Sequence, residues 1–88
     1  MFSGTVYESQ DTAAAATARR FVTTQKRLRD VVIQVTTFAQ LFGTASNQRF
    51  SVAAGGSLSF TKVDIATLYF KNSVAGSNGT VTIIGVEL

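Results

Sequence analysis

The carboxylates are the first candidates for reaction chemistry in this sequence, because the chain contains neither cysteine nor histidine and thiolate and imidazole chemistry are excluded. The acids are Glu8, Asp11, Asp30, Asp64 and Glu87. Asp30 and Asp64 stand at the ends of expected strands, and a carboxylate pair within about 5–10 Å would suit glycoside hydrolysis. The competing interpretation is that they cap corners and turns, as Asp64 would before a short turn at 65–67. We favour the caps, and we expect no enzyme, catalytic residue, metal, cofactor or small-molecule substrate.

Three further chemical motifs are incomplete. Ser57 follows Gly55 and Gly56 as in a nucleophile turn, but the G-x-S-x-G spacing and a histidine base are missing. The same glycines are not followed by the lysine of a phosphate-binding loop. The side-chain oxygens of the segment 72–79 come only from Asn and Ser, which suit calcium poorly without a carboxylate. These motifs therefore predict structure and no chemistry.

The strongest charge signal is a group of cations that precedes the clearest strand. This basic group lies within residues 19–29, a segment that contains no acid. Its members are Arg19, Arg20, Lys26, Arg27 and Arg29. It suits nucleic acid or another anionic partner, and it equally suits a strand edge that charge protects against unwanted pairing. Only Phe21 lies nearby as a stacking aromatic. We therefore do not expect nucleic acid, and we expect the group to meet acidic groups of a neighbouring subunit.

Alternation of apolar and polar residues predicts strands along most of the chain. The clearest is 28–37, with Val31, Ile33 and Val35 on one face. Other strands are expected at 38–43, 50–53, 57–61, 68–71 and 80–86, after a short β-branched run at 21–24. About seven short strands with turn signals between them predict a sandwich or a small barrel. We favour a single all-β domain, a small antiparallel β-sandwich of jelly-roll-like type.

One turn organises the middle of this pattern. Gly55 and Gly56 separate the strands 50–53 and 57–61, and glycine readily supplies the positive φ angles of a tight reversal. The sequence therefore predicts a hairpin between these two strands. In the strand 68–71, Leu68 and Phe70 are expected to point inward, which leaves Tyr69 as an outward aromatic.

The first residues differ in composition from the rest, which predicts an N-terminal arm at 1–17 and a β-sandwich domain at 18–88. The alanines at 13–16 could form a helix capped by Asp11 or Thr12, but about two turns are too short to hold together in water. We favour an extended arm. Since an arm has no core of its own, its apolar side chains are expected to anchor on a neighbouring subunit: Phe2, Val6 and Tyr7.

Composition also favours an oligomer. The chain is 45% hydrophobic and only 15% charged, against the usual charged share of about 25%. A 9.4 kDa chain buries only about 63% of its unfolded surface, so association with copies of itself, as a homotrimer or another homo-oligomer, would add stability. The apolar runs are far shorter than the roughly 20 residues of a membrane span. We therefore expect no membrane partner.

From residue 18 onward, a succession of strand and turn steps carries a resemblance. The steps are Ala18-Arg19-Arg20-Phe21, Val31-Val32-Ile33-Gln34-Val35, Leu41-Phe42-Gly43, Phe50-Ser51-Val52-Ala53-Ala54-Gly55-Gly56-Ser57-Leu58 and Asp64-Ile65-Ala66-Thr67-Leu68-Tyr69-Phe70. Together they resemble small β-sandwich virion structural proteins of tailed bacteriophages, of the decoration (cement) or tail-associated type. The chain departs from that pattern in having Gly55-Gly56 where proline-glycine is frequent.

The resemblance implies a non-enzymatic structural role in the virion. Our first hypothesis is a capsid decoration (cement) protein, made in the host cytoplasm and located on the capsid surface. Its partners would be the major capsid protein and copies of itself. The alternatives are a tail, baseplate or fibre-associated adaptor or receptor-binding module, and a small nucleic-acid-binding β-barrel that uses the basic group.

Overall fold

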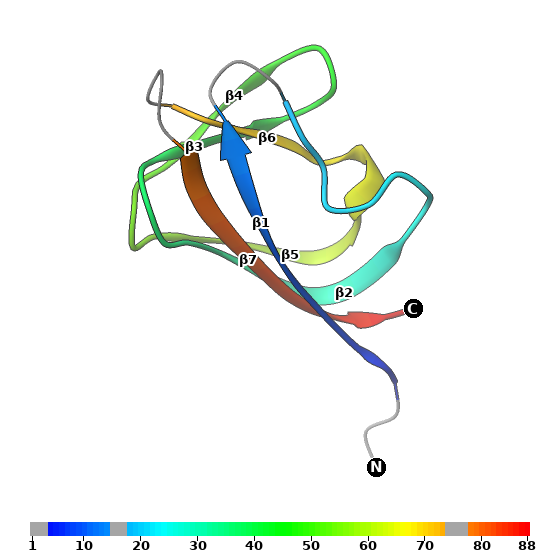
Figure 1. The fold of residues 1–88 in the computed structure, drawn as a ribbon. Coiled ribbons are helices and arrows are strands. Elements are labelled where there is room, and N and C mark those ends of the chain that lie inside the picture. Colours follow the sequence, from blue (N-terminus) through cyan, green and yellow to red (C-terminus); the bar gives the residue numbers. More distant parts are fainter. Residues whose placement is uncertain (1–3, 15–17, 74–77) are drawn as a thin grey trace.

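The computed structural model describes residues 4–14, 18–73 and 78–88. Two antiparallel sheets pack face to face (Figure 1). One sheet has four strands in the order β1-β7-β2-β5, and the other has three in the order β4-β3-β6. The elements are β1 (Val6–Ala14), β2 (Arg27–Val35), β3 (Gln40–Gly43), β4 (Gln48–Val52), β5 (Ser57–Asp64), the single-turn 3₁₀ helix η1 (Ile65–Thr67), β6 (Tyr69–Asn72) and β7 (Asn78–Glu87). The expected small all-β sandwich is confirmed.

The strand order is that of a jelly roll with one strand reduced to a single bridge. Arg19 pairs with Phe70 of β6 in an isolated antiparallel bridge, and each backbone N–H donates to the other residue's carbonyl at 2.8 Å. An eight-stranded jelly roll carries a full strand at this place. The β-branched run at 21–24 therefore does not form a strand; Phe21 and Val22 instead pack against the core.

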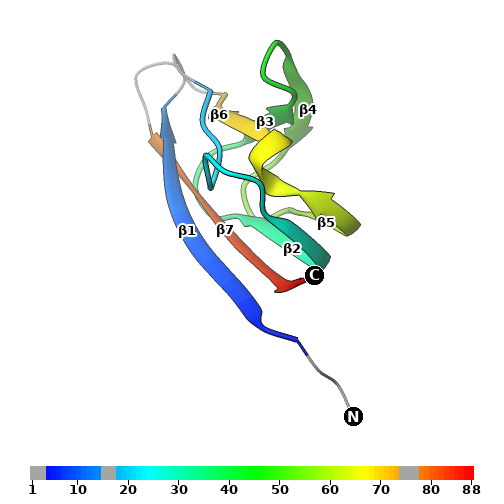
Figure 2. The same cartoon turned by 90° about the vertical axis from the view of Figure 1, so that its right-hand side faces the viewer.

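The N-terminal segment is extended, as expected, but it lies in the sandwich. β1 pairs with β7 along its whole length, from Val6 opposite Val86 to Ala14 opposite Asn78. Figure 2 shows β1 running beside β7 at the side of the four-stranded sheet. Pairing with β7 satisfies backbone groups that a free arm would leave to water. The boundary expected at 17/18 stays a prediction, since residues 15–17 lie outside the described residues.

The core fills the space between the sheets. The expected inward positions of β2, which are Val31, Ile33 and Val35, are each at most 1% exposed. Leu68 and Phe70 are buried as expected. The remaining buried core residues come from both sheets and from η1: Leu28, Phe42, Val52, Ile65, Val81 and Ile83.

A buried polar pair links two strands at one end of the sandwich. Gln40 of β3 stands opposite Asn72 of β6, and the Gln40 Nε2 group donates to Asn72 Oδ1 at 2.8 Å. The two residues are 0% and 1% exposed. Gly79 of β7 packs directly against both amides, where a side-chain Cβ would overlap them. This end therefore depends on hydrogen bonds as well as on apolar packing.

The hairpin expected at Gly55 and Gly56 is wrong. β4 pairs with β3 and β5 pairs with β2, so the two flanking strands belong to different sheets. The turn instead carries the chain across the sandwich, and the Gly55 N–H donates to Val35 O at 2.7 Å. Gly55 has the expected positive φ of 85°, whereas Gly56 does not. Turn glycines mark a change of direction, and they do not determine which strands pair.

Asp64 closes the corner after β5. Its Oδ1 accepts the backbone N–H of Ala66 at 3.0 Å and that of Lys26 at 3.1 Å. It is the N-cap of η1, so the expected capping role is confirmed. Because Lys26 precedes β2, this one carboxylate ties the start of that strand to the corner.

We expect Asp64→Ala to lower the free energy of unfolding by about 1–2 kcal/mol, because two part-buried N–H groups lose their acceptor. Urea denaturation followed by circular dichroism measures this loss. Asp64→Asn, which keeps a side-chain oxygen at the same place, should lose less than half as much. Equal losses for the two variants would contradict the capping role.

Candidate functional site

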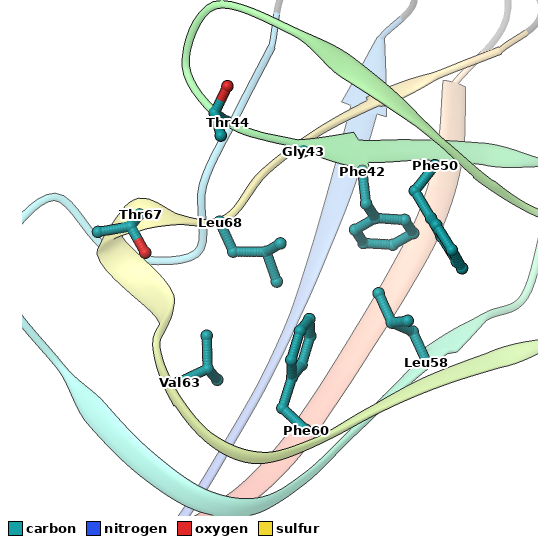
Figure 3. A pocket seen from close by; sticks show the side chains of 9 residues that line it. All are labelled: Phe42, Gly43, Thr44, Phe50, Leu58, Phe60, Val63, Thr67 and Leu68. Carbon is teal, nitrogen blue, oxygen red and sulfur yellow. The ribbon is translucent and has the colours of Figure 1, made fainter.

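An apolar groove opens between the two sheets along one side of the sandwich (Figure 3). Phe42 and Phe50 point into it from the three-stranded sheet, and Leu58 and Phe60 point toward them from β5. The cavity has a volume of about 380 Å³. Its lining comes from β3, β4, β5 and the η1 corner: Phe42, Gly43, Thr44, Phe50, Leu58, Phe60, Val63, Thr67 and Leu68.

The strand order explains why the groove is open. β4 is the last strand of its sheet and β5 is the last strand of the other, so no strand in the described part of the chain continues either sheet on this side. Phe42, one strand further in, is 2% exposed, whereas Phe50 on β4 is 60% exposed. Leu58, Phe60 and Val63 are half-buried against the core. The side chains that alternate inward at these two edges are left only partly covered.

The lining determines what the groove can do. Its side chains are aliphatic or aromatic apart from the hydroxyls of Thr44 and Thr67. None of the nine lining residues is titratable, so these side chains cannot transfer a proton near pH 7 or ligate a metal ion well. The groove can bury apolar side chains of a protein partner, and the hydroxyls at one end can meet a backbone group.

The acids lie outside this groove. Asp64 accepts backbone N–H groups, and Asp30 is an exposed residue inside β2 with φ of 51°, 3.5 Å from Arg29 Nη1. The two carboxylates therefore occupy a cap and an irregular position in a strand. In the part of the chain that the structure describes, no group of three or more acids lies close enough together to hold a metal ion.

The first two members of the basic group contact their own chain. Arg19 Nη2 lies 3.1 Å from Asp11 Oδ1 of β1. The Arg20 Nη1 group donates to Ala66 O at 3.1 Å, and its guanidinium carbon lies 5.2 Å from the ring centre of Tyr69. Tyr69 is half-buried beneath this guanidinium, so the expected outward aromatic is partly covered by its own chain.

The other three members of the basic group also contact residues of their own chain. Lys26 Nζ lies 3.5 Å from Glu87 Oε1 and 5.1 Å from the ring centre of Tyr7. The Arg27 guanidinium nitrogens Nε and Nη2 lie 3.1 and 3.2 Å from the Gln25 side-chain amide, whose oxygen would accept from both once the amide is turned over. Arg29 lies beside Asp30. Arg19, Arg20 and Lys26 thus connect the segment 19–26 to β1, η1 and β7. The role of the basic group toward a neighbouring subunit stays a prediction.

The three expected arm anchors have different environments. Phe2 lies outside the described residues. Val6, at the start of β1, is 59% exposed. Tyr7 is half-buried against the core of its own chain, so the structure gives it an intramolecular contact. Binding of these residues to a neighbour stays a prediction.

Sequence reasoning missed the groove because alternation shows only which face of a strand is apolar. Inward alternation does not distinguish a covered position from one beside an open edge. A weak signal was present in Arg49 and Lys62, single cations in the strands that prove to be edges, where charge is common. That signal marks edges, and it does not predict a groove.

No helix in the described ranges is long and apolar enough to cross a membrane.

Comparisons with known proteins give a structural likeness but no family match. A scan against protein-family models and a search of curated proteins give no match. One similar solved structure is described by the words "Bacillus endospore appendages form a novel family of disulfide-linked pili"; it is 21% identical with a TM-score of 0.46, covering 97% of this chain and 91% of that chain.

Proposed function

We propose that this chain is a non-enzymatic structural protein of a bacteriophage virion, and specifically a capsid decoration (cement) protein. It attaches to the capsid surface through protein contacts and stabilises the head. Its partners are the major capsid protein and further copies of itself. The observation that carries the proposal is the open apolar groove with Phe50 at its edge, and the resemblance to phage β-sandwich virion proteins supplies the type of particle.

The groove supports a structural role because a partner that fills it would stabilise the sandwich. The folded chain exposes 5135 Å², close to the value of about 5,000 Å² expected for its mass, so the core is of ordinary size for a small domain. An apolar opening in such a domain marks a binding surface more often than a defect. A protein that fills it stabilises the sandwich by mass action.

The lining also indicates the class of partner. Aromatic residues are enriched at protein–protein interfaces, and Phe50, which is more than half exposed beside half-buried apolar residues, can contact an apolar segment of a protein partner. We assign the major capsid protein to this groove. An apolar segment of that protein would lie between β4 and β5, over Phe50 and Phe60.

Counting copies in particles tests the proposal. The chain and its Phe50→Ser variant would each be produced in the host that carries the gene, and purified particles would be examined by quantitative mass spectrometry. We expect hundreds of copies of the unaltered chain per particle, and about tenfold lower occupancy for F50S, because a central aromatic contact is lost.

The matched control is Phe38→Ser, the same exchange at an aromatic residue that is 39% exposed and lies outside the groove lining. It should leave occupancy within about twofold of the unaltered chain, as surface substitutions away from a contact usually do. A few to a few dozen copies per particle would replace the decoration role by the tail-associated alternative. Absence from the particle, or equal losses for the two variants, would overturn the proposal.

A further inference from the structure

The four-stranded sheet ends on both sides in a long strand with one free edge. β1 has nine residues and pairs with β7, and β5 has eight residues and pairs with β2. Neither contains a proline. The outer backbone groups of such strands are a template for pairing with another chain. Figure 2 shows β1 and β5 at opposite sides of this sheet.

The directions of the strands make the two edges complementary. β1 and β2 both run antiparallel to β7, and β5 runs antiparallel to β2. β5 is therefore antiparallel to β1. A second copy displaced sideways in the plane of the sheet, without being turned over, brings its β1 alongside β5 in antiparallel register. From this geometry we propose that copies of this chain join head to tail, with β1 of one copy adding to β5 of the next.

Charge favours the pairing of β1 with β5 over the pairing of two β1 edges or of two β5 edges. β1 carries two acids and no base, and Asp11 already contacts Arg19, which leaves Glu8 exposed at this edge. The carboxylate of Asp64 on β5 accepts backbone N–H groups, which leaves Lys62 exposed at the other edge. Among the described residues neither Glu8 nor Lys62 forms an ion pair. Two β1 edges would bring acid beside acid, and two β5 edges would bring lysine beside lysine, and like charges across strands are unfavourable.

A head-to-tail contact leaves one free β1 and one free β5 at the ends of every open assembly. It therefore closes into a ring or continues as a row, and it does not stop at a dimer unless geometry forbids further addition. This inference extends the homo-oligomer part of the proposed function. It concerns only copies of this chain in solution, so its test can fail while the protein still binds to a particle through the groove.

Sedimentation velocity of the purified chain at low salt, at concentrations from about 10 μM to 1 mM, tests the contact. We expect species that grow beyond the dimer as concentration rises. Glu8→Lys and Lys62→Glu should each weaken association about five- to tenfold, because an exposed attraction becomes a repulsion of similar size. The double variant E8K/K62E, and an equal mixture of the two single variants, should return to within about twofold of the unaltered chain.

Lys71→Glu is the matched control for K62E, because it makes the same charge change on β6 of the other sheet. It should leave association within about twofold of the unaltered chain. A monomer at every concentration would overturn the proposal. It would also be overturned if E8K had no effect while K62E did, or if the double variant were weaker than both single variants.

Hydrogen exchange gives a second readout of the same contact. Backbone N–H groups of β1 and β5 that point away from their sheet neighbours should exchange several times more slowly in a concentrated sample than in a dilute one, because they become paired. The outer N–H groups of β4 should not change. Protection at β4, with none at β1 and β5, would assign self-association to the groove and overturn the edge pairing.

Discussion

Phe70→Ala is expected to lower the free energy of unfolding by about 3–5 kcal/mol, the usual cost of deleting a fully buried aromatic side chain. Phe70 is 0% exposed. Its ring centre lies 4.7 Å from that of Phe21 and 5.9 Å from that of Phe42. The deletion therefore removes two aromatic contacts and leaves a cavity at the centre of the sandwich. Thermal unfolding followed by circular dichroism should show a melting temperature lower by at least about 12 °C.

The size of this effect decides whether the variant folds at all. A domain of this length has a total stability of only about 4–13 kcal/mol, so F70A should populate the unfolded state measurably at room temperature. Phe50→Ala is the matched control, since the same atoms are removed from a side chain that is 60% exposed. Its loss should stay below about 1 kcal/mol. Comparable losses for the two variants would contradict the placement of the core between the sheets.

The sequence predicted the position and the buried face of individual strands better than it predicted which strands pair. Alternation at Val31, Ile33 and Val35, and at Leu68 and Phe70, identified buried faces correctly, because the side-chain period of a strand is local. Which strands pair is a long-range property. The turn at Gly55 suggested a hairpin, yet β4 and β5 belong to different sheets, and no residue near the turn carries that information.

The N-terminal segment is a second case in which strand pairing could not be predicted from the local sequence. Its composition suggested an arm, and the residues of β1 alternate only weakly, with Val6 and Tyr7 the only large apolar side chains in the strand. Pairing along the whole of β7 places it in the sheet through backbone hydrogen bonds, which depend little on side-chain type. Deleting residues 1–17 would therefore remove a sheet strand, and it would not be a clean test of arm-mediated binding.

The candidate site follows from these same long-range features. The apolar alternation of the strands 50–53 and 57–61 was visible in the sequence, but the opening exists only because β4 and β5 are both last in their sheets among the described residues. The head-to-tail pairing likewise requires knowing that β1 and β5 are the two edges of one sheet. Glu8 and Lys62 have no significance for each other until the topology places them at opposite edges of that sheet.

Gly79→Ala is the second substitution expected to have a large effect, with a loss of about 3–5 kcal/mol in the free energy of unfolding. A Cβ at this position would overlap Gln40 Nε2, Asn72 Oδ1 and the backbone carbonyl oxygen of Thr37. The amides could move only by breaking their 2.8 Å hydrogen bond in the buried interior. The carbonyl could move only with the chain that joins β2 to β3. Urea denaturation measures the loss.

The control for G79A is Gly55→Ala, which separates steric overlap from backbone conformation. Gly55 has φ of 85° and no atom within 4 Å of the place where a Cβ would lie, so its replacement costs only the strain of a left-handed backbone, about 1–2 kcal/mol. G79A should therefore be the more destabilised of the two by about 2 kcal/mol or more. If G79A were no worse than G55A, the Gln40–Asn72 pair would not be closely packed against β7.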